Sequence, residues 1–412
     1  MVSSVVVVGG GHAGCEIAAA LRGKGYDGAV TLICGEPVLP YSRPPLSKQF
    51  LSGELSADRI LLRPASFYEK FDIRTRTSTM VTRIDRGASR VLLGDGTSLS
   101  YEALVIATGG SPRRLPASLI PDADMAPTNL HYVRTVADVE ALRADLAAAT
   151  RTVVIGGGYV GLEVAASVRR LGIDVTVIEA ADRLLMRVVG ADVSHVVEKR
   201  HRDDGIELLL GTEVTRFDVD ESGRITYVRL GDGTKVPADV VVAGIGLIPN
   251  DQLAEECGLE VADGIVVDQF CRTSDTKIFA VGDCSRHPCS EHGGLRRLES
   301  VSNATEQART VADALIGGTT PYAALPWFWS DQGELKLRSV GLSAGCDTSV
   351  MRSQGEGRLA VLHLKEGQIR AADVLGDLRF FATVKRLAAA RVAATPEQIE
   401  DPDFDLESLL DR

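Results

Sequence analysis

The chain of 412 residues contains no apolar run long enough to cross a bilayer. Its apolar runs, such as residues 5–8 and 240–243, have only the length of a strand. No positively charged segment precedes the first apolar run, so we do not expect a signal peptide. These absences predict a cytoplasmic protein that does not associate with a membrane.

Paired cysteines are also absent. The seven cysteines are dispersed, and none belongs to a C-x-x-C motif. Such an odd set, without a secretory signal, predicts reduced thiols that mostly serve packing. Cys284 and Cys289 have the spacing of some redox-active pairs, but the Ser-Arg-His-Pro between them is a poor setting for one. A metal or iron–sulfur site needs about four clustered Cys or His ligands, so we predict none.

Excess positive charge is lacking as well, because the formal net charge is −11. An acidic chain has little general affinity for nucleic acid or for anionic membranes. Basic residues nevertheless recur in the last third of the chain, at Arg286, Arg296, Arg297, Lys336, Arg338, Arg379, Lys385, Arg386 and Arg391. They form either an ordinary solvated surface or a local patch that steers an acidic protein partner.

Two glycine motifs of the form G-x-G-x-x-G are the strongest positive signal. One spans residues 9–14 and the other spans residues 156–161. Each follows a short β-branched run and opens an Ala-rich helical pattern, so each lies at a strand-to-helix turn where a pyrophosphate meets a helix N-terminus. Two motifs in one chain predict a protein that holds two dinucleotides and passes electrons between them.

An internal repeat extends beyond the glycine motifs. Each βαβ pattern ends in an acidic residue, Glu36 or Glu179, at the place where a ribose is expected. Each is followed by a hairpin with a Gly-Asp-Gly turn, at residues 94–96 and 231–233, and then by an apolar strand that ends in small residues. This duplication predicts two domains of the same architecture.

The pattern changes after residue 326. Short strands are expected at residues 335–341, 358–364 and 369–374, followed by a terminal helix at residues 378–393. We therefore predict an α/β fold with two Rossmann-like dinucleotide-binding domains, of the glutathione-reductase-like kind, and a C-terminal α+β domain. The Pro-rich stretch at residues 113–130 is expected to mark a crossing between domains.

With these parts in place, the chain resembles the NADH-dependent ferredoxin reductases of the two-dinucleotide-binding flavoprotein family. This group is typified by putidaredoxin reductase and by the reductase components of bacterial ring dioxygenases. The similarity covers nearly the full length. Its most specific pieces are residues 43–48 (RPPLSK), 107–109 (ATG), 281–283 (VGD), 299–304 (ESVSNA) with 306–308 (EQA), and 326–332 (PWFWSDQ).

The resemblance implies that the first glycine motif binds FAD and that the second binds NADH. It implies an FAD-binding domain of residues 1–113 and 249–325, an NAD-binding domain of residues 114–248 and a C-terminal domain of residues 326–412. The implied FAD-binding residues are Gly9, Gly11, Ala13, Gly14, Gly35, Glu36, Arg43, Lys48, Val81, Ala107, Thr108, Gly109, Arg134, Asp283, Val301 and Trp329. The implied NAD-binding residues are Gly156, Gly158, Tyr159, Val160, Gly161, Glu179 and Gly246. For Val81 and Val301, core packing is the competing interpretation.

Lys48 and Glu163 are the residues that we expect to be catalytic. Lys48 follows a turn fixed by Pro44 and Pro45, and Glu163 lies on the first turns of the second motif's helix. A salt bridge between them beside the flavin would hold both side chains and leave a cation where negative charge develops. The competing interpretation is a surface lysine and a helix-favouring glutamate.

Glu179 predicts a preference for NADH over NADPH, because a carboxylate that accepts hydrogen bonds from the 2′-hydroxyl repels a 2′-phosphate. Arg183 would weaken that repulsion if its side chain turned inward. In the helix expected at residues 303–315, Asn303 and Glu306 have the spacing of a capping box. The resemblance implies that the first turn of this helix is aimed at the flavin.

The cysteine positions separate this chain from other members of the superfamily. It lacks the cysteine pair of the disulfide reductases, and residues 41–43 (YSR) stand where the flavin-linked peroxidases carry a reactive cysteine. The resemblance therefore implies that single electrons pass to a 2Fe-2S ferredoxin. Trp327 and Trp329 either shape the face where electrons leave or belong to the core.

The ferredoxin would serve a bacterial oxygenase, either a haem-thiolate monooxygenase or a Rieske dioxygenase. A rubredoxin reductase shares almost every motif and is one alternative. An NADH-sensing flavoprotein that resembles apoptosis-inducing factor is another, although the acidic charge counts against it. We expect a monomer or a weak homodimer.

Overall fold

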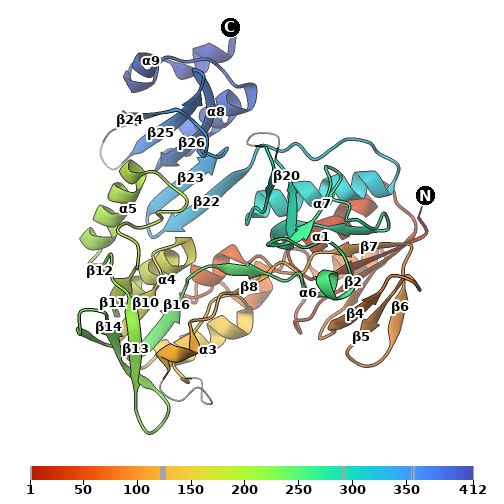
Figure 1. The fold of residues 1–412 in the computed structure, drawn as a ribbon, viewed down its shortest axis with the longest axis horizontal. Helices are drawn as coiled ribbons and strands as arrows, with labels where there is room; N and C mark the ends of the chain where they lie inside the picture. Colours follow the sequence, from red (N-terminus) through yellow and green to blue (C-terminus); the bar gives the residue numbers. More distant parts are fainter. Residues whose placement is uncertain (1, 121–126, 290–292, 354, 356–357, 412) are drawn as a thin grey trace. The chain divides into compact units, whose positions relative to one another are not determined.

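A computed structural model describes residues 2–120, 127–289, 293–353, 355 and 358–411 (Figure 1). Its contacts divide the chain into two compact units. Unit 1 consists of residues 1–43, 58–111 and 247–328, and unit 2 consists of residues 44–57, 112–246 and 329–412. Residues 44–57, expected with the first domain, therefore pack with unit 2. Most of the expected crossing at residues 113–130 is described, but residues 121–126 lie outside the described part of the chain.

Unit 1 contains a five-stranded parallel sheet with the strand order β19-β7-β1-β2-β3. Its strands are β1 (Ser4–Val8), β2 (Ala29–Ile33), β3 (Ile73–Arg76), β7 (Ala103–Ile106) and β19 (Ile278–Ala280). Their Val, Leu and Ile side chains are mostly buried, as is typical of a parallel sheet covered by helices. Val8 is in register with Ile33 and with Ile106, so the loops that follow β1, β2 and β7 meet at one edge of the sheet.

Helices and small antiparallel sheets complete unit 1. α1 (His12–Gly23) and α7 (Val301–Leu315) pack against each other. The expected hairpin is present as β5 and β6, which form a small antiparallel sheet with β4. The other elements are η2 (Ala57–Ile60), α2 (Ala65–Lys70), β4 (Val81–Asp85), β5 (Arg90–Leu93), β6 (Ser98–Ser100), β8 (Gly110–Pro112), β17 (Leu247–Pro249), α6 (Gln252–Glu256), β18 (Ile265–Val266), η4 (Gly282–Cys284), β20 (Ser285–Pro288) and β21 (Leu295–Arg296).

Unit 2 repeats this architecture around a second parallel sheet, with the strand order β12-β11-β10-β16-β9. Its strands are β9 (Leu130–His131), β10 (Arg151–Ile155), β11 (Asp174–Ile178), β12 (Glu207–Leu209) and β16 (Val240–Ala243). The second expected hairpin is present as β14 and β15. The remaining elements of this part are η1 (Pro44–Ser47), η3 (Ala117–Leu119), α3 (Val136–Leu146), α4 (Tyr159–Arg170), α5 (Ala191–Asp203), β13 (Val214–Val219), β14 (Ile225–Leu230) and β15 (Lys235–Pro237).

The C-terminal segment forms a five-stranded sheet with the order β22-β23-β26-β25-β24. Its strands are β22 (Trp327–Gln332), β23 (Leu335–Val340), β24 (Thr348–Ser353), β25 (Leu359–Lys365) and β26 (Gln368–Leu375), followed by α8 (Leu378–Ala390), α9 (Pro396–Glu400) and η5 (Leu406–Asp411). β22 and β24 were not predicted from the sequence. The end of the last helix is expected at residue 393, whereas Arg391 adopts a left-handed conformation that ends α8.

Two local expectations are wrong. The capping box expected for Asn303 and Glu306 is absent, because α7 begins earlier and the Ser300 hydroxyl accepts the hydrogen bond from the Asn303 N–H at 3.1 Å. Glu306 pairs instead with Arg309, at 2.9 Å. Pro44 and Pro45, whose pairing predicts a turn without regular structure, instead open the 3₁₀ helix η1.

The structure also bears on membranes, metals and thiols. None of the described helices combines the length and the apolar composition that crossing a membrane requires. Among the described residues, no cluster of three or more His, Cys, Asp or Glu side chains is arranged to hold a metal ion. All seven cysteines are free thiols, including Cys284 and Cys289.

Candidate active site

The first glycine motif forms a tight turn that leaves one position open. Gly9 has a φ of +122°, and a Cβ atom added there would lie 2.1 Å from the carbonyl oxygen of Ala107. A Cβ atom at Gly14 would lie 1.9 Å from the carbonyl oxygen of Gly9. At Gly11, in contrast, no described atom lies within 4 Å of the added atom. Gly9 and Gly14 are therefore required by packing, whereas Gly11 leaves space for a ligand.

The second glycine motif has the same geometry. A Cβ atom at Gly156, whose φ is +109°, would lie 2.5 Å from the carbonyl oxygen of Gly244, and one at Gly161 would lie 2.2 Å from that of Gly156. At Gly158 the nearest atom is 3.9 Å away. The N-cap residues of α1 and α4 are Gly11 and Gly158, which have no side chain to accept hydrogen bonds from the first N–H groups of the helix. These N–H groups therefore suit an anion such as a pyrophosphate.

The acidic residue that follows each βαβ unit is held by hydrogen bonds. Glu36 accepts hydrogen bonds from the Tyr41 hydroxyl at 2.5 Å and from the Arg43 guanidinium at 2.6 Å. Glu179 accepts from the backbone N–H groups of Gly157 at 2.5 Å and Ala181 at 2.8 Å. A carboxylate has about four acceptor sites, so each acid retains capacity for the hydroxyls of a ribose.

Arg183 does not turn toward Glu179. Its guanidinium donates to the carbonyl oxygens of Val189 at 2.8 Å and Met186 at 3.0 Å. Both acceptors belong to the loop between β11 and α5, so Arg183 fixes that loop. Arg183 therefore does not offset the charge of the Glu179 carboxylate.

The other residues of unit 1 that the resemblance assigns to FAD lie near the edge of the sheet where β1, β2 and β7 end, or in the core of this unit. Thr108 donates to the Asn250 carbonyl oxygen at 2.6 Å, and the Asn250 amide donates back to the Thr108 carbonyl oxygen at 2.9 Å. Asp283 lies in η4, where Gly282 N–H donates to the Gln307 side chain at 2.7 Å and so joins η4 to α7. The remaining positions are Ala13 and Gly35 beside the motif and β2, Ala107 and Gly109 after β7, and Val301 at the start of α7.

Val81, like Ala13 and Ala107, belongs to the hydrophobic core of unit 1, and only 5% of it is exposed. Its burial favours the packing interpretation. Lys48, Arg134 and Trp329 belong to unit 2. Arg134 precedes α3, where its backbone N–H donates to Asp138 at 3.2 Å, and Trp329 lies in β22.

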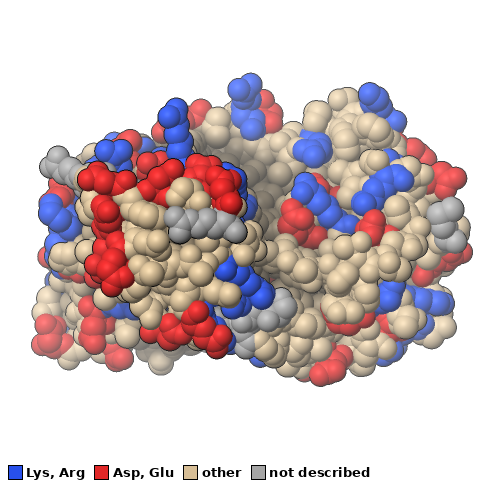
Figure 2. Space-filling model, turned by 90° about the horizontal axis from the view of Figure 1, so that it is seen from above, with Lys and Arg blue, Asp and Glu red and all other residues tan. Residues whose placement is uncertain are grey.

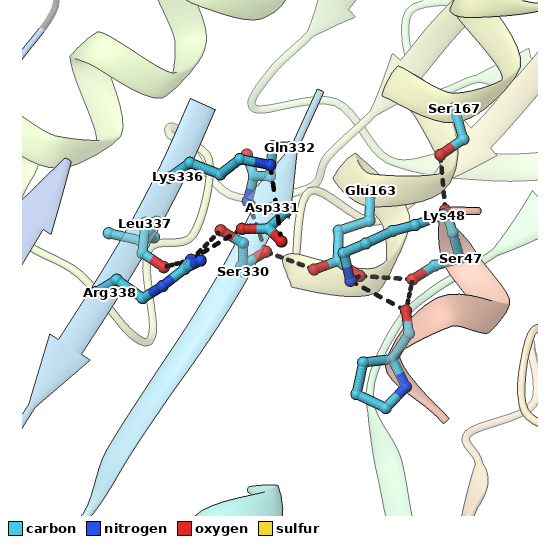
Figure 3. Close-up of polar contacts among 11 residues, drawn as sticks. Ser47, Lys48, Glu163, Ser167, Ser330, Asp331, Gln332, Lys336, Leu337 and Arg338 are labelled. Carbon is cyan, nitrogen blue, oxygen red and sulfur yellow. Dashed lines mark hydrogen bonds and ion pairs between the residues drawn. The ribbon is translucent and has the colours of Figure 1, made fainter. Parts of the chain in front are cut away.

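The ion pair predicted between Lys48 and Glu163 is present. Lys48 Nζ lies 2.6 Å from Glu163 Oε2, and both side chains are buried (Figure 3). Lys48 Nζ also donates to the Pro44 carbonyl oxygen at 3.1 Å. The interpretation as a surface lysine and an ordinary helical glutamate is therefore wrong.

Two serine hydroxyls, which the sequence analysis did not single out, complete this buried pair. Ser47 donates to Glu163 Oε2 at 2.5 Å, and Ser330 donates to Oε1 at 2.7 Å. Ser167, one turn along α4, donates to the Ser47 carbonyl oxygen at 2.7 Å and holds η1 against the helix. The Glu163 carboxylate is therefore held by three donors, the Lys48 ammonium group and the two serine hydroxyls.

At the start of α4 lies Tyr159, whose pKa is raised by burial and by the nearby carboxylate of Asp373. The side chain of Ser339 hydrogen-bonds to this tyrosine. Val160, the next residue, is exposed. Gly246 has a φ of +117° and follows the strand β16, whose loop packs on the second motif through Gly244.

At least four of the nine basic residues noted in the last third of the chain form ion pairs with acids. Arg297 pairs with Glu299 at 2.6 Å and with Asp263 at 3.4 Å. Lys336 and Arg338 both pair with Asp331, and Arg386 pairs with Glu407. On the face drawn in Figure 2, Lys and Arg side chains are interspersed with Asp and Glu. These pairings favour a mixed surface over a strongly positive patch.

Comparisons with known proteins agree with this arrangement. The family described as pyridine nucleotide-disulphide oxidoreductase matches residues 3–308, and the family described as reductase C-terminal matches residues 327–410. Putidaredoxin reductase of Pseudomonas putida is 41% identical over 409 residues, 99% of this chain and 96% of that protein. The ferredoxin–NAD(+) reductase component of the anthranilate 1,2-dioxygenase system of Burkholderia cepacia is 40% identical over 98% of both chains.

A solved structure shows the same fold. In the crystal structure of the covalent putidaredoxin reductase–putidaredoxin complex, one chain is 40% identical to this protein and superposes with a TM-score of 0.95 over 99% of this chain and 98% of that one. The predicted fold class, with two Rossmann-like domains and a C-terminal α+β domain, is confirmed. The chain therefore belongs to the pyridine nucleotide-disulphide oxidoreductase family.

Proposed function

We propose that this protein is an FAD-containing, NADH-dependent ferredoxin reductase that supplies single electrons to a 2Fe-2S ferredoxin of a bacterial oxygenase system. The observation that carries the proposal is the pair of glycine motifs, each of which leaves one open position at a helix N-terminus. Full-length relatives that are reductases for such systems support it.

The residues present fit two dinucleotides. Gly9, Gly11 and Gly14 would hold the FAD pyrophosphate against α1, with Glu36 on the ribose, because the space at Gly11 admits a ligand. The corresponding set for NADH is Gly156, Gly158, Gly161 and Glu179. The bound flavin would supply the conversion of a two-electron hydride into single electrons.

The chain's own contribution at the reacting end comes from Lys48 and Glu163. Glu163 fixes the ammonium group of Lys48, because the two side chains are buried and lie 2.6 Å apart. A fixed cation in a buried site stabilises negative charge that develops nearby more strongly than a mobile surface cation does. We assign the stabilisation of this negative charge to Lys48, and we assign to Glu163 the role of holding the Lys48 ammonium group in place.

Glu179 selects NADH. Two backbone N–H groups hold its carboxylate at the end of β11, and Arg183 is engaged with its own loop. A 2′-phosphate placed there would meet a fixed negative charge. NADPH would therefore bind more weakly than NADH.

The low reactivity of the buried thiols supports electron transfer from the flavin to an external carrier. Cys34 lies beside the first motif, where burial raises its pKa to about 12, and burial also raises the pKa of Cys15 and Cys284. Thiols of this kind are protonated at neutral pH and are poor nucleophiles. Disulfide exchange at these positions is therefore disfavoured, whereas a ferredoxin acceptor requires no thiol.

The test is NADH-driven reduction of cytochrome c by the purified holoprotein, measured with no carrier, with a 2Fe-2S ferredoxin from an oxygenase system, and with a rubredoxin. Strong stimulation by the ferredoxin alone is expected. Stimulation by the rubredoxin alone would favour the rubredoxin reductase alternative. Slow flavin reduction without help from either carrier would contradict the proposal and favour a sensing flavoprotein.

A further inference from the structure

We propose that Ser330, supplied by the C-terminal sheet, is a positioning residue for the Lys48–Glu163 pair. The inference rests on the proposed function, because the pair is given its role there. Ser330 is fully buried, and its hydroxyl donates to Glu163 Oε1 at 2.7 Å (Figure 3). Among the described residues, Ser330 is the donor to Oε1, whereas Oε2 accepts from both Lys48 and Ser47.

The strand geometry explains why β22 can reach this pair. Side chains two residues apart on a strand point to the same face. Ser330 and Gln332 therefore share a face of β22, and they contact two successive helices of unit 2: Ser330 reaches Glu163 on α4, and Gln332 reaches His201 on α5 at 3.0 Å. The C-terminal sheet thus holds both helices through its edge strand.

Three hydrogen bonds lead from His201 through Gln332 and Ser330 to Glu163, and in each the donor lies on the side away from Glu163. An ionised Glu163 only accepts, so Ser330 must give its single hydrogen to the carboxylate and must itself accept from Gln332 Nε2, 3.4 Å away. The amide oxygen of Gln332 then faces His201 Nε2, which must carry the ring hydrogen. Burial lowers the pKa of His201, which agrees with a neutral ring.

The donors of this network, as the structure orients them, all point toward Glu163. His201, Gln332 and Ser330 are each at most 1% exposed, so no solvent replaces a lost partner. Without the Ser330 hydroxyl, Oε1 would remain buried without this donor, which makes the carboxylate costly to keep ionised. Glu163 would then hold Lys48 less firmly, and the ammonium group would become more mobile and more reactive.

The test compares Ser330→Ala with Ser330→Thr, which retains the hydroxyl, and with a matched control, Ser349→Ala. Ser349 lies in β24 at the opposite edge of the same sheet, where its hydroxyl hydrogen-bonds to His363 at 2.8 Å. If Ser330→Ala does not fold, Ser330→Cys removes the strong donor at nearly constant volume. Near-UV circular dichroism and a thermal melt verify folding of each variant.

The first readout needs no turnover. Holoprotein is acetylated with a limiting amount of acetic anhydride, and labelling of Lys48 relative to Lys199 is quantified by mass spectrometry. Labelling of Lys48 should rise at least about threefold in Ser330→Ala, return close to wild type in Ser330→Thr and remain unchanged in Ser349→Ala.

The second readout is the rate of flavin reduction by NADH in a stopped-flow experiment. At saturating NADH this rate should fall about tenfold in Ser330→Ala, while the NADH dissociation constant changes less than about twofold. If Ser330→Ala matches Ser349→Ala in both readouts, Ser330 has no positioning role. A wild-type flavin that NADH does not reduce would overturn the proposed function instead, and the labelling result would still decide whether Ser330 controls Lys48.

Discussion

The carboxylate of Glu179 accepts a hydrogen bond from the backbone N–H of Gly157, 2.5 Å away. This bond fixes the acid beside the second glycine motif, where a ribose would lie. Glu179→Ala is therefore expected to reduce the preference for NADH over NADPH by a factor of at least about ten, or ~1.4 kcal/mol. The ratio of the two kcat/KM values measures this preference.

Glu207 provides the control, because it lies on the neighbouring strand β12 and accepts a hydrogen bond only from Thr176 among the contacts described. Glu207→Ala should leave the ratio unchanged. An unchanged ratio in Glu179→Ala would remove Glu179 from cofactor selection.

The buried ion pair predicts a characteristic pattern of stabilities. Lys48→Met should lower the free energy of unfolding by about 3–5 kcal/mol, because it leaves the buried Glu163 carboxylate without its cation. The double variant Lys48→Met, Glu163→Leu should be more stable than Lys48→Met alone, since no buried charge remains. Urea denaturation of each variant measures these differences.

The exposed pair Lys199–Asp203 is the control for this series. Lys199→Met should cost less than about 1 kcal/mol, as is usual for an exposed pair. A Lys48→Met variant as stable as Lys199→Met would show that burial of the pair has no energetic consequence.

The glycine motifs separate packing from ligand binding. Gly9→Ala should unfold or severely destabilise unit 1, because its Cβ atom would lie 2.1 Å from a backbone oxygen. Gly11→Ala should leave the stability of the apoprotein nearly unchanged but weaken FAD binding about tenfold or more, since the added methyl occupies the open position.

Gly23→Ala, at the open C-terminal end of α1, is the matched control. It should lower neither the stability of the apoprotein nor its affinity for FAD. Fluorescence titration of apoprotein with FAD measures the affinities. If Gly11→Ala binds FAD as tightly as Gly23→Ala does, the open position is not the pyrophosphate site.

Asp239 predicts a pH-dependent contribution to stability. Its hydrogen bonds with Arg151 and with Thr150 lower the pKa of the Asp239 carboxyl below its usual value. The ionised carboxylate therefore stabilises the folded protein fully above the pKa of the unfolded state, which is about 3.9. This stabilisation is lost as the pH falls through the lower pKa of the folded state. Asp239→Asn should therefore cost about 1–3 kcal/mol at pH 7. That difference should shrink as the pH falls below about 4.

Asp174→Asn is the control, because the Asp174 side chain is 81% exposed and pairs only with Arg169 among the contacts described. It should cost little at either pH. A cost for Asp239→Asn that stays constant from pH 7 to pH 3 would contradict the assigned cause.

The sequence predicts well those elements of the fold that are determined by residues close together in the chain. β1, the glycine turn and α1 follow from neighbouring residues, as do the two hairpins. The expected start of α7 was wrong because both Ser300 and Asn303 are residue types that cap helices, and only the structure shows that Ser300 does so. β22 was missed because its residues 327–332 read as a motif rather than as an alternating strand.

The buried contacts of the site could not be predicted in full for a different reason. The Lys48–Glu163 pair was predicted from the proline turn before Lys48 and from the place of Glu163 on the helix of the second motif. Nothing in the sequence brings Ser47 or Ser330 to Glu163, which lies more than a hundred residues from either. A serine has no periodicity or charge that indicates its partner. Arg297 similarly looked like a free surface cation until its two acidic partners were located.

The most direct test of the proposed electron path is an anaerobic titration of the holoprotein. NADH should bleach the yellow flavin absorbance, and about two equivalents of oxidised 2Fe-2S ferredoxin should restore it, because one hydride carries two electrons and each ferredoxin accepts one. Bleaching that the ferredoxin does not reverse, or a flavin that NADH leaves unchanged, would contradict the account.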